Sequence, residues 1–261
     1  MKIKANGISI NYQVDGREGA PWLIFSNSLA TNLTMWDEQA DALKGAYRVL
    51  RYDQRGHGGS EATPGRYTFE LLMADAIGLM DALGIKKAHF AGLSMGGATA
   101  LGLAEKHPDR FDRIVVCDSP CQSTAASTQQ WEERIAVAEK QGIEALVEPT
   151  LARWFPPETL AANPPHIDKV RRMIRATPAK GFIGCAAALA HHDYAAAVAT
   201  VTRPVLFMAG EKDGVTPVAM RKLSAALPGS RYVELPGAGH ISNMDQPRAF
   251  TEVLRDFLKA A

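Results

Sequence analysis

The chain has 261 residues, of which 46% are hydrophobic and 22% are charged, and its formal net charge at pH 7 is +1. Because 29 basic side chains nearly balance 28 acidic ones, the composition gives no sign of a basic surface for nucleic acid or for an anionic membrane. It favours a protein that acts on a small, roughly neutral molecule.

The N-terminal segment and the cysteines indicate the compartment. MKIKANGISI contains no apolar stretch of the kind that a secretory signal needs, and no apolar run approaches the ~18 residues of a membrane span. The three cysteines, Cys117, Cys121 and Cys185, lack metal-binding spacing and are typical of free thiols in a reducing compartment. We therefore expect a cytoplasmic protein without a bound metal. Its oligomeric state stays open between a monomer and a homodimer.

Strand and helix patterns alternate along much of the chain. Residues 2–5 and 8–14 flank Asn6-Gly7, a dipeptide typical of a tight β-hairpin. Further on, apolar side chains recur at helical spacing from Phe69 to Leu83. Strands that alternate with helices need crossover connections, so the sheet should be mostly parallel. After the hairpin, apolar runs predict buried strands at residues 22–25, 47–52, 88–93, 114–117, 205–209 and 232–235.

The alternation is interrupted between residues 120 and 202. Helical patterns broken by Pro156-Pro157 and Pro164-Pro165 fill this part, and an alanine-rich stretch over residues 186–199 closes it. We interpret the segment as a helical cap inserted into a core domain. The predicted division is residues 120–202 for the cap, with residues 1–119 and 203–261 for the core.

Residues 92–96 read GLSMG, which matches the pattern G-x-S-x-G. A predicted strand precedes this stretch and a predicted helix follows it, as in the nucleophile elbow of serine hydrolases. In such an elbow the glycines leave room for a strained backbone that lifts the serine hydroxyl clear of the sheet. Ser94 is therefore the candidate nucleophile, although a glycine-rich turn used for packing is the alternative.

A serine hydroxyl needs a base to take its proton and an acid to orient that base, in the chain order serine, acid, histidine. His240 lies in a glycine-rich loop after the last predicted strand and is the best candidate base. His57 precedes the serine, so a structural role is expected there. Asp213 lies between Ser94 and His240 and is the favoured acid, while Asp118 at the end of the strand after the elbow is the alternative.

These features resemble the α/β-hydrolases that carry a cap domain. The resemblance extends from about Ile3 to Leu258 and includes RYDQRGHGGS, GLSMGG, AGEKDGVTP and GAGHISNMDQP. It implies a mostly parallel eight-stranded sheet flanked by helices, with the cap inserted after strand 6. Within this superfamily, FSNSLATNLTMWDEQ, WFPPETL and a W-x-x-R-I beginning at Trp131 are most similar to the 3-oxoadipate enol-lactonases of aromatic catabolism.

The resemblance implies that the protein hydrolyses a small lactone to 3-oxoadipate without a cofactor. Ser94 would attack the carbonyl while His240 takes its proton. Backbone N–H groups of Met95 and Leu29 would stabilise the tetrahedral oxyanion. The segment Ser26-Asn27-Ser28, which stands where many α/β-hydrolases have His-Gly, would then turn the N–H of Leu29 toward the substrate.

A lactone with a free carboxylate also needs a cation in or beneath the cap. Arg134 and Arg153 are the candidates, with Trp131 and Trp154 as apolar walls, although helical Arg and Trp residues are more often surface charge and cap core. His191-His192 is not expected to bind a metal, because adjacent side chains point to different sides of a helix or strand.

Two other functions fit the same residues. One is a carboxylesterase or another lactonase with the same triad and a different small ester as its substrate. The other is a non-catalytic receptor that binds a lactone without turning it over, since fold does not imply function.

Overall fold

The computed structural model describes residues 1–259, apart from the side chain of residue 197, and contains an eight-stranded sheet. Its strand order is β1-β2-β4-β3-β5-β6-β7-β8, in which β1–β2 and β2–β4 pair antiparallel and the other neighbours pair parallel. The predicted mostly parallel sheet is thus confirmed. The strands are β1 (Lys2–Ala5), β2 (Ile8–Asp15), β3 (Trp22–Ser26), β4 (Arg48–Tyr52), β5 (Ala88–Leu93), β6 (Phe111–Cys117), β7 (Val205–Gly210) and β8 (Arg231–Leu235).

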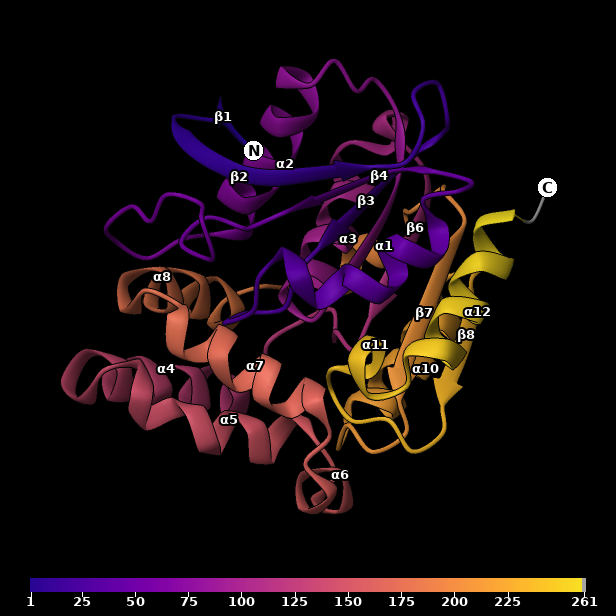
Figure 1. Cartoon of the computed structure of the whole chain (residues 1–261). Helices are drawn as coiled ribbons and strands as arrows, with labels where there is room; N and C mark the ends of the chain where they lie inside the picture. The colour runs from indigo at the N-terminus through magenta and orange to yellow at the C-terminus, as the bar shows by residue number, and fades with distance from the viewer. Residues whose placement is uncertain (260–261) are drawn as a thin grey trace.

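Helices cover both faces of this sheet (Figure 1). The helices α2 and α3 pack against each other, and α1 packs against α12. The helices of the sheet domain are α1 (Asp37–Leu43), α2 (Phe69–Ala82), α3 (Met95–Lys106), α10 (Thr216–Ala226), α11 (Ser242–Asp245) and α12 (Pro247–Lys259).

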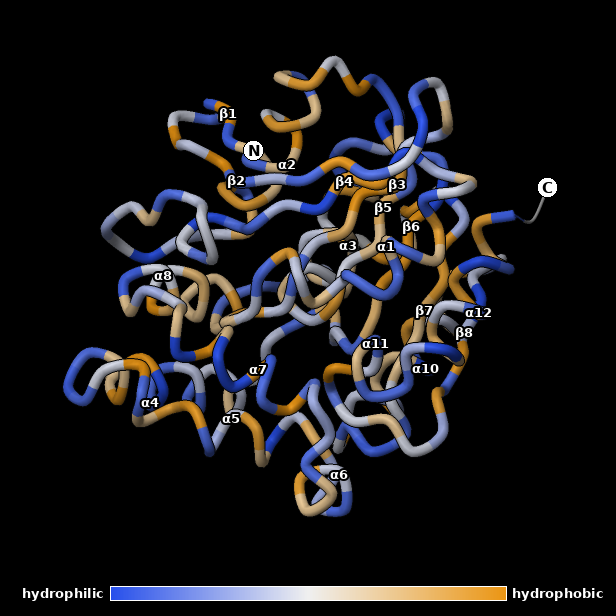
Figure 2. The backbone as a smooth tube through the Cα atoms, in the orientation of Figure 1, coloured by the Kyte–Doolittle hydropathy of each residue, from blue (hydrophilic) through white to orange (hydrophobic). Residues whose placement is uncertain are grey.

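The core lies along the central strands. Every residue of β7 is buried, as expected for a parallel strand that is covered on both faces. Figure 2, coloured by hydropathy, shows orange tube along the neighbouring strands β3 to β7. At the sheet edge, Asn6 and Gly7 both have positive φ, 45° and 78°, which the two-residue turn of the predicted hairpin requires.

The helical insertion follows β6, as predicted. Figure 1 shows α4, α5, α6 and α7 gathered beside one end of the sheet, with α8 next to them. The two segments that enter and leave the insertion pair with each other: Ser123 N–H donates to the carbonyl of His192 at 2.8 Å, and Tyr194 N–H to that of Cys121 at 2.8 Å. The inserted helices are α4 (Ala125–Gln141), α5 (Val147–Trp154), α6 (Pro157–Ala162), α7 (Pro165–Ala176), α8 (Ala179–Ala190) and α9 (Ala195–Val198).

The strand order places the candidate residues together. β3 and β5 are neighbours, while β4 lies on one side of them and β6 on the other, so the direction of strand addition reverses between β3 and β5. Ligands of parallel sheets bind beyond the carboxyl ends of the strands at such a reversal. Across residues 1–259, no helix combines the length and apolar character needed to cross a bilayer.

Candidate active site

Ser94 lies at a sharp turn between β5 and α3. Its φ and ψ are 56° and −113°, a conformation that non-glycine residues rarely adopt. A Cβ on Gly92 would come within 1.9 Å of the carbonyl oxygen of Gly96, and one on Gly96 within 2.2 Å of the carbonyl oxygen of Ser26. Both glycines are therefore required by close backbone approach, which is the physical reason for the G-x-S-x-G pattern.

Ser94, His240 and Asp213 form one hydrogen-bonded chain. The Oγ of Ser94 is 2.9 Å from Nε2 of His240, and Nδ1 of His240 is 2.8 Å from Oδ2 of Asp213. Because a carboxylate can only accept, Nδ1 carries the proton and Nε2 is free to accept the serine proton. The side chains of His240 and Asp213 are 15% and 10% exposed, so bulk water has little access to the pair.

The cap holds His240 in place. The N–H of His240 donates to the carbonyl oxygen of Trp154 at 2.7 Å, and the two rings stack with centroids 5.9 Å apart. Trp154 is the last residue of α5. The histidine loop is therefore fixed by the inserted helices as well as by the sheet domain.

Asp118, the alternative acid, forms no hydrogen bond with His240. Its Oδ1 accepts a hydrogen bond from the N–H of Gly210 at 2.7 Å, and its Oδ2 accepts one from the hydroxyl of Ser242. It is fully buried, and burial together with the nearby charge of Asp213 raises the pKa of Asp118 well above its ordinary value. A carboxyl group with a raised pKa is poorly suited to stabilising an imidazolium.

Leu29 presents a backbone N–H with no acceptor among the described residues. The N–H groups on either side of it are used: that of Ser28 donates to Sδ of Met35 at 3.4 Å, and that of Ala30 to Nε2 of His57 at 2.9 Å. Met95 is the first residue of α3, where an N–H has no acceptor within the helix. Leu29 and Ser94 line the same cavity. These two donors thus have the character that an oxyanion hole needs.

A cavity of about 560 Å³ opens beside the three triad residues. Of the four cap residues that the sequence analysis proposed for substrate binding, Trp131, Arg153 and Trp154 line the cavity, whereas Arg134 does not. Its wall also includes Gln130, Val215 and Lys222, which the sequence analysis did not single out. Such residues could not be found from motifs, because the packing of the cap on the sheet domain decides which side chains meet the cavity.

Arg134 and Arg153 both lie against the indole of Trp131. Their guanidinium carbons are 4.8 and 5.5 Å from its ring centroid. Burial and the neighbouring Arg153 lower the pKa of Arg134 to about 10, and Arg134 donates a hydrogen bond to Thr150 at 2.8 Å. The guanidinium of Arg153 donates no hydrogen bond to any described residue. Neither guanidinium has a carboxylate partner among the described residues, and the one that lines the cavity, that of Arg153, attracts an anion to this part of it.

His191 and His192 have separate surroundings. His191 lies 3.4 Å from a carboxylate oxygen of Glu132, whereas the buried His192 approaches the carbonyl oxygens of Leu189 and Pro120 at 2.9 and 3.3 Å. Within residues 1–259, no group of three or more His, Cys, Asp or Glu side chains is arranged to hold a metal ion.

Comparison with known proteins assigns the family. A family model described as "alpha/beta hydrolase fold" matches residues 21–247. The chain belongs to the α/β-hydrolases. It is 35% identical to 3-oxoadipate enol-lactonase 2 of Acinetobacter baylyi over 257 residues, 98% of this chain and 96% of the relative. This α/β-hydrolase is therefore related to enol-lactonases.

Solved structures extend the relationship. The enol-lactonase from Burkholderia xenovorans LB400 superposes with a TM-score of 0.96 at 39% identity, and all of both chains is covered. A thermophilic esterase from Thermogutta terrifontis, solved with malate bound, superposes with a TM-score of 0.93 at 28% identity over 99% of this chain and 98% of that one. The chain is accordingly a hydrolase related to both enol-lactonases and esterases.

Proposed function

We propose that this α/β-hydrolase opens the ring of 3-oxoadipate enol-lactone and yields 3-oxoadipate through an acyl-enzyme. The observation that carries the proposal is Arg153, a cation without a carboxylate partner in the described part of the chain, in the same cavity as Ser94 and His240. The substrate joins a lactone carbonyl to a free carboxylate. Arg153 supplies a partner for the carboxylate, while the serine meets the carbonyl. The enol-lactonase relatives support the same substrate.

The reaction follows from the geometry of the triad. His240 takes the proton of Ser94 at Nε2 while Oγ bonds to the lactone carbonyl carbon, and Asp213 stabilises the imidazolium. The N–H groups of Leu29 and Met95 stabilise the oxyanion that forms. The ring C–O bond then breaks, and the leaving enol oxygen receives the proton from His240.

The second half of the reaction restores the enzyme. The enol formed by ring opening stays attached to the acyl group on Ser94, and its tautomerisation to a ketone makes ring opening hard to reverse. His240 next takes a proton from water, whose oxygen attacks the acyl carbon, and it returns that proton to Ser94 Oγ as the ester bond breaks. No cofactor takes part in these steps.

Kinetics with two substrates test the proposal. The wild type and Ser94→Ala are compared on the enol-lactone and on p-nitrophenyl acetate, an ester without a carboxylate. We expect the wild type to prefer the enol-lactone in kcat/KM and Ser94→Ala to lose turnover of both. A wild type that strongly preferred the uncharged ester would instead favour the carboxylesterase alternative. Binding of the lactone without turnover would favour a receptor.

Arg153→Gln tests the role of the cation. A hydrogen bond to a charged group contributes about 1.5–3 kcal/mol, so KM for the enol-lactone should rise about 10-fold or more while KM for p-nitrophenyl acetate stays unchanged. The matched control is Arg175→Gln, because Arg175 is a cap residue whose guanidinium is paired with Glu144 at the surface. An equal change on both substrates would contradict the proposed carboxylate contact.

A further inference from the structure

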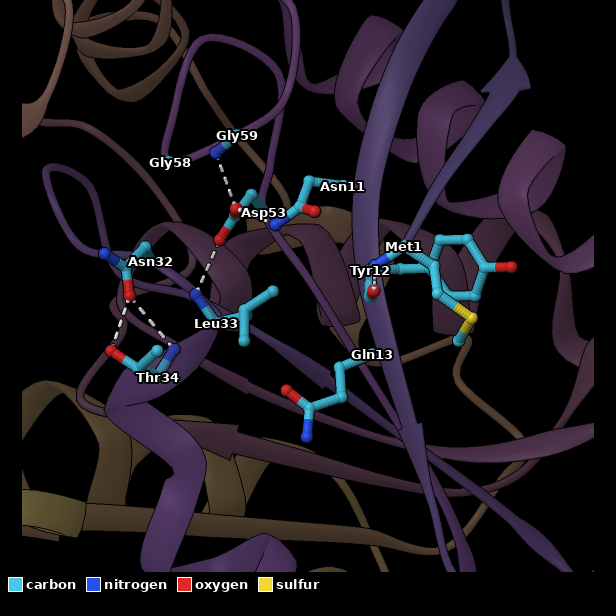
Figure 3. A pocket seen from close by; sticks show the side chains of 10 residues that line it. All are labelled: Met1, Asn11, Tyr12, Gln13, Asn32, Leu33, Thr34, Asp53, Gly58 and Gly59. Atoms are coloured by element: carbon cyan, nitrogen blue, oxygen red, sulfur yellow. Dashed lines mark hydrogen bonds between the residues drawn. The ribbon is translucent and has the colours of Figure 1, made fainter.

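The loop that follows β4 holds the segment that contains Leu29. Figure 3 shows the carboxylate of Asp53 between two backbone N–H groups, that of Leu33 at 2.7 Å and that of Gly59 at 2.8 Å. At the other end of the segment, the side-chain amide of Gln54 donates to the carbonyl oxygen of Asn27 at 2.6 Å. The segment is thus attached to one loop both before and after Leu29.

His57 makes the attachment nearest to Leu29. Its side chain is fully buried, and Nε2 accepts the hydrogen bond from Ala30 N–H at 2.9 Å. Its other ring nitrogen is 3.1 Å from the carbonyl oxygen of Arg55, which can only accept, so Nδ1 carries the proton and Nε2 is unprotonated. Burial lowers the pKa of His57, which keeps the ring neutral and Nε2 available as an acceptor.

The backbone at Ala30 needs such a restraint. Its φ is 58°, a left-handed conformation that costs a residue with a Cβ about 1–2 kcal/mol. Strained conformations of this kind persist where the surroundings fix them. The hydrogen bond to His57 fixes the peptide group between Leu29 and Ala30. The N–H of Leu29 itself has no acceptor among the described residues, and Leu29 lines the same cavity as Ser94.

We propose that His57 is a positioning residue for the oxyanion hole: by accepting the N–H of Ala30, it holds the N–H of Leu29 toward the carbonyl that Ser94 attacks. The inference rests on the proposed acyl-enzyme reaction but not on the identity of the lactone. His57 touches neither the substrate nor the triad, so its effect passes through the backbone of residues 29 and 30. Stabilisation of the oxyanion should therefore depend on the acceptor at Nε2.

Two amide variants separate this role from simple packing. In His57→Gln the amide oxygen reaches about as far as Nε2 and can accept the N–H of Ala30, whereas in His57→Asn the shorter side chain cannot. Turnover of p-nitrophenyl acetate is measured and expressed per serine that reacts with a fluorophosphonate, so that misfolded protein lowers the titre and not kcat. His107→Asn, at the far end of α3 from Ser94, is the control for a His-to-Asn change.

Loss of one oxyanion donor costs roughly 10²–10³ in kcat, so His57→Asn should lose about 10²-fold in kcat with KM within about twofold of the wild type. His57→Gln should keep kcat within about fivefold, and His107→Asn should match the wild type. The affinity for a trifluoromethyl ketone, whose adduct with Ser94 carries an oxyanion, should fall in parallel with kcat/KM in His57→Asn. If His57 only supported packing, His57→Asn would lower thermal stability, but the ketone affinity and kcat/KM would not fall in parallel.

The result that overturns the inference is a kcat for His57→Asn within about twofold of the wild type, or an equal loss in His57→Gln and His57→Asn. Ketone affinity that stays constant while kcat falls would overturn it as well. Absence of turnover and of fluorophosphonate labelling in the wild type would refute the proposed function itself, and with it the oxyanion hole that His57 serves. The two failures are therefore distinguishable.

Discussion

Asp118→Asn should leave turnover intact and make the protein increasingly more stable than the wild type as pH rises. Asp118 is fully buried, and its pKa is raised first by burial and then by the charge of Asp213. The asparagine oxygen can still accept the N–H of Gly210, and its NH₂ can donate to the hydroxyl of Ser242. The substitution thus keeps both contacts and removes the ionisable group.

The sign of the pH effect follows from the direction of the pKa shift. Above an unfolded-state pKa of about 3.9, the unfolded chain has released the Asp118 proton that the folded chain still holds. Through this window the free energy of unfolding of the wild type falls as pH rises, by at most about 1.4 kcal/mol per pH unit for one proton. Asp118→Asn lacks this pH-dependent loss of stability. The amount by which its free energy of unfolding exceeds that of the wild type should therefore grow with pH and level off once the folded-state pKa of Asp118 is passed.

Urea unfolding followed by tryptophan fluorescence between pH 4.5 and 8 measures this difference. Where the free energy of unfolding changes most steeply with pH, the same difference between variant and wild type would appear in thermal unfolding as about 3–5 °C in Tm per pH unit for a chain of this size. Asp109→Asn is the control, because the side chain of Asp109 is 96% exposed and its ion pair with Arg203 should contribute little. The reasoning is wrong if the stability difference is constant or shrinks as pH rises, or if kcat falls by more than about tenfold.

Three further substitutions test the site and its support. Asp213→Asn should lower kcat by about 10⁴-fold, because it removes the carboxylate that fixes the tautomer of His240, and steady-state kinetics should show KM little changed. Asp75→Ala should destabilise the protein by about 3–5 kcal/mol in urea unfolding, since it leaves the guanidinium of Arg55 buried without its carboxylate. Gly96→Ala should cost about 1–3 kcal/mol or more and reduce kcat, because the added Cβ would lie 2.2 Å from a carbonyl oxygen of β3; unfolding and activity assays on one preparation would check both effects.

The sequence predicts the elbow well because its rules are local. A side chain at Gly92 would collide with the backbone of the turn, and one at Gly96 would collide with the backbone of the neighbouring strand. The apolar strand runs likewise mark their own burial, and β7 is buried along its whole length. Asp213 and His240 follow from chain order once Ser94 is assigned, and the structure places them within hydrogen-bond distance.

The sequence predicts less where two distant segments must meet. The sequence offered Arg134 and Arg153 equally as partners for a substrate carboxylate. In the structure, the packing of α4 against the rest of the cap keeps Arg134 off the cavity wall, whereas Arg153 lines it. His57 precedes the serine and so fell outside the triad order. Its contact with Ala30 joins two loops without any periodic pattern, and no local signal could reveal it.

The end of α5 links substrate recognition to the catalytic base. Arg153 faces the cavity, and the next residue, Trp154, accepts the N–H of His240 and stacks on its ring. A Cβ on Gly239 would lie 2.2 Å from the carbonyl oxygen of Trp154, so the histidine loop approaches this helix as closely as backbone allows. A displacement of α5 would therefore move the carboxylate partner and the support of His240 together. For this reason, cap substitutions that displace α5 should alter both KM for an anionic lactone and kcat, which a cap that merely covers the cavity would not do.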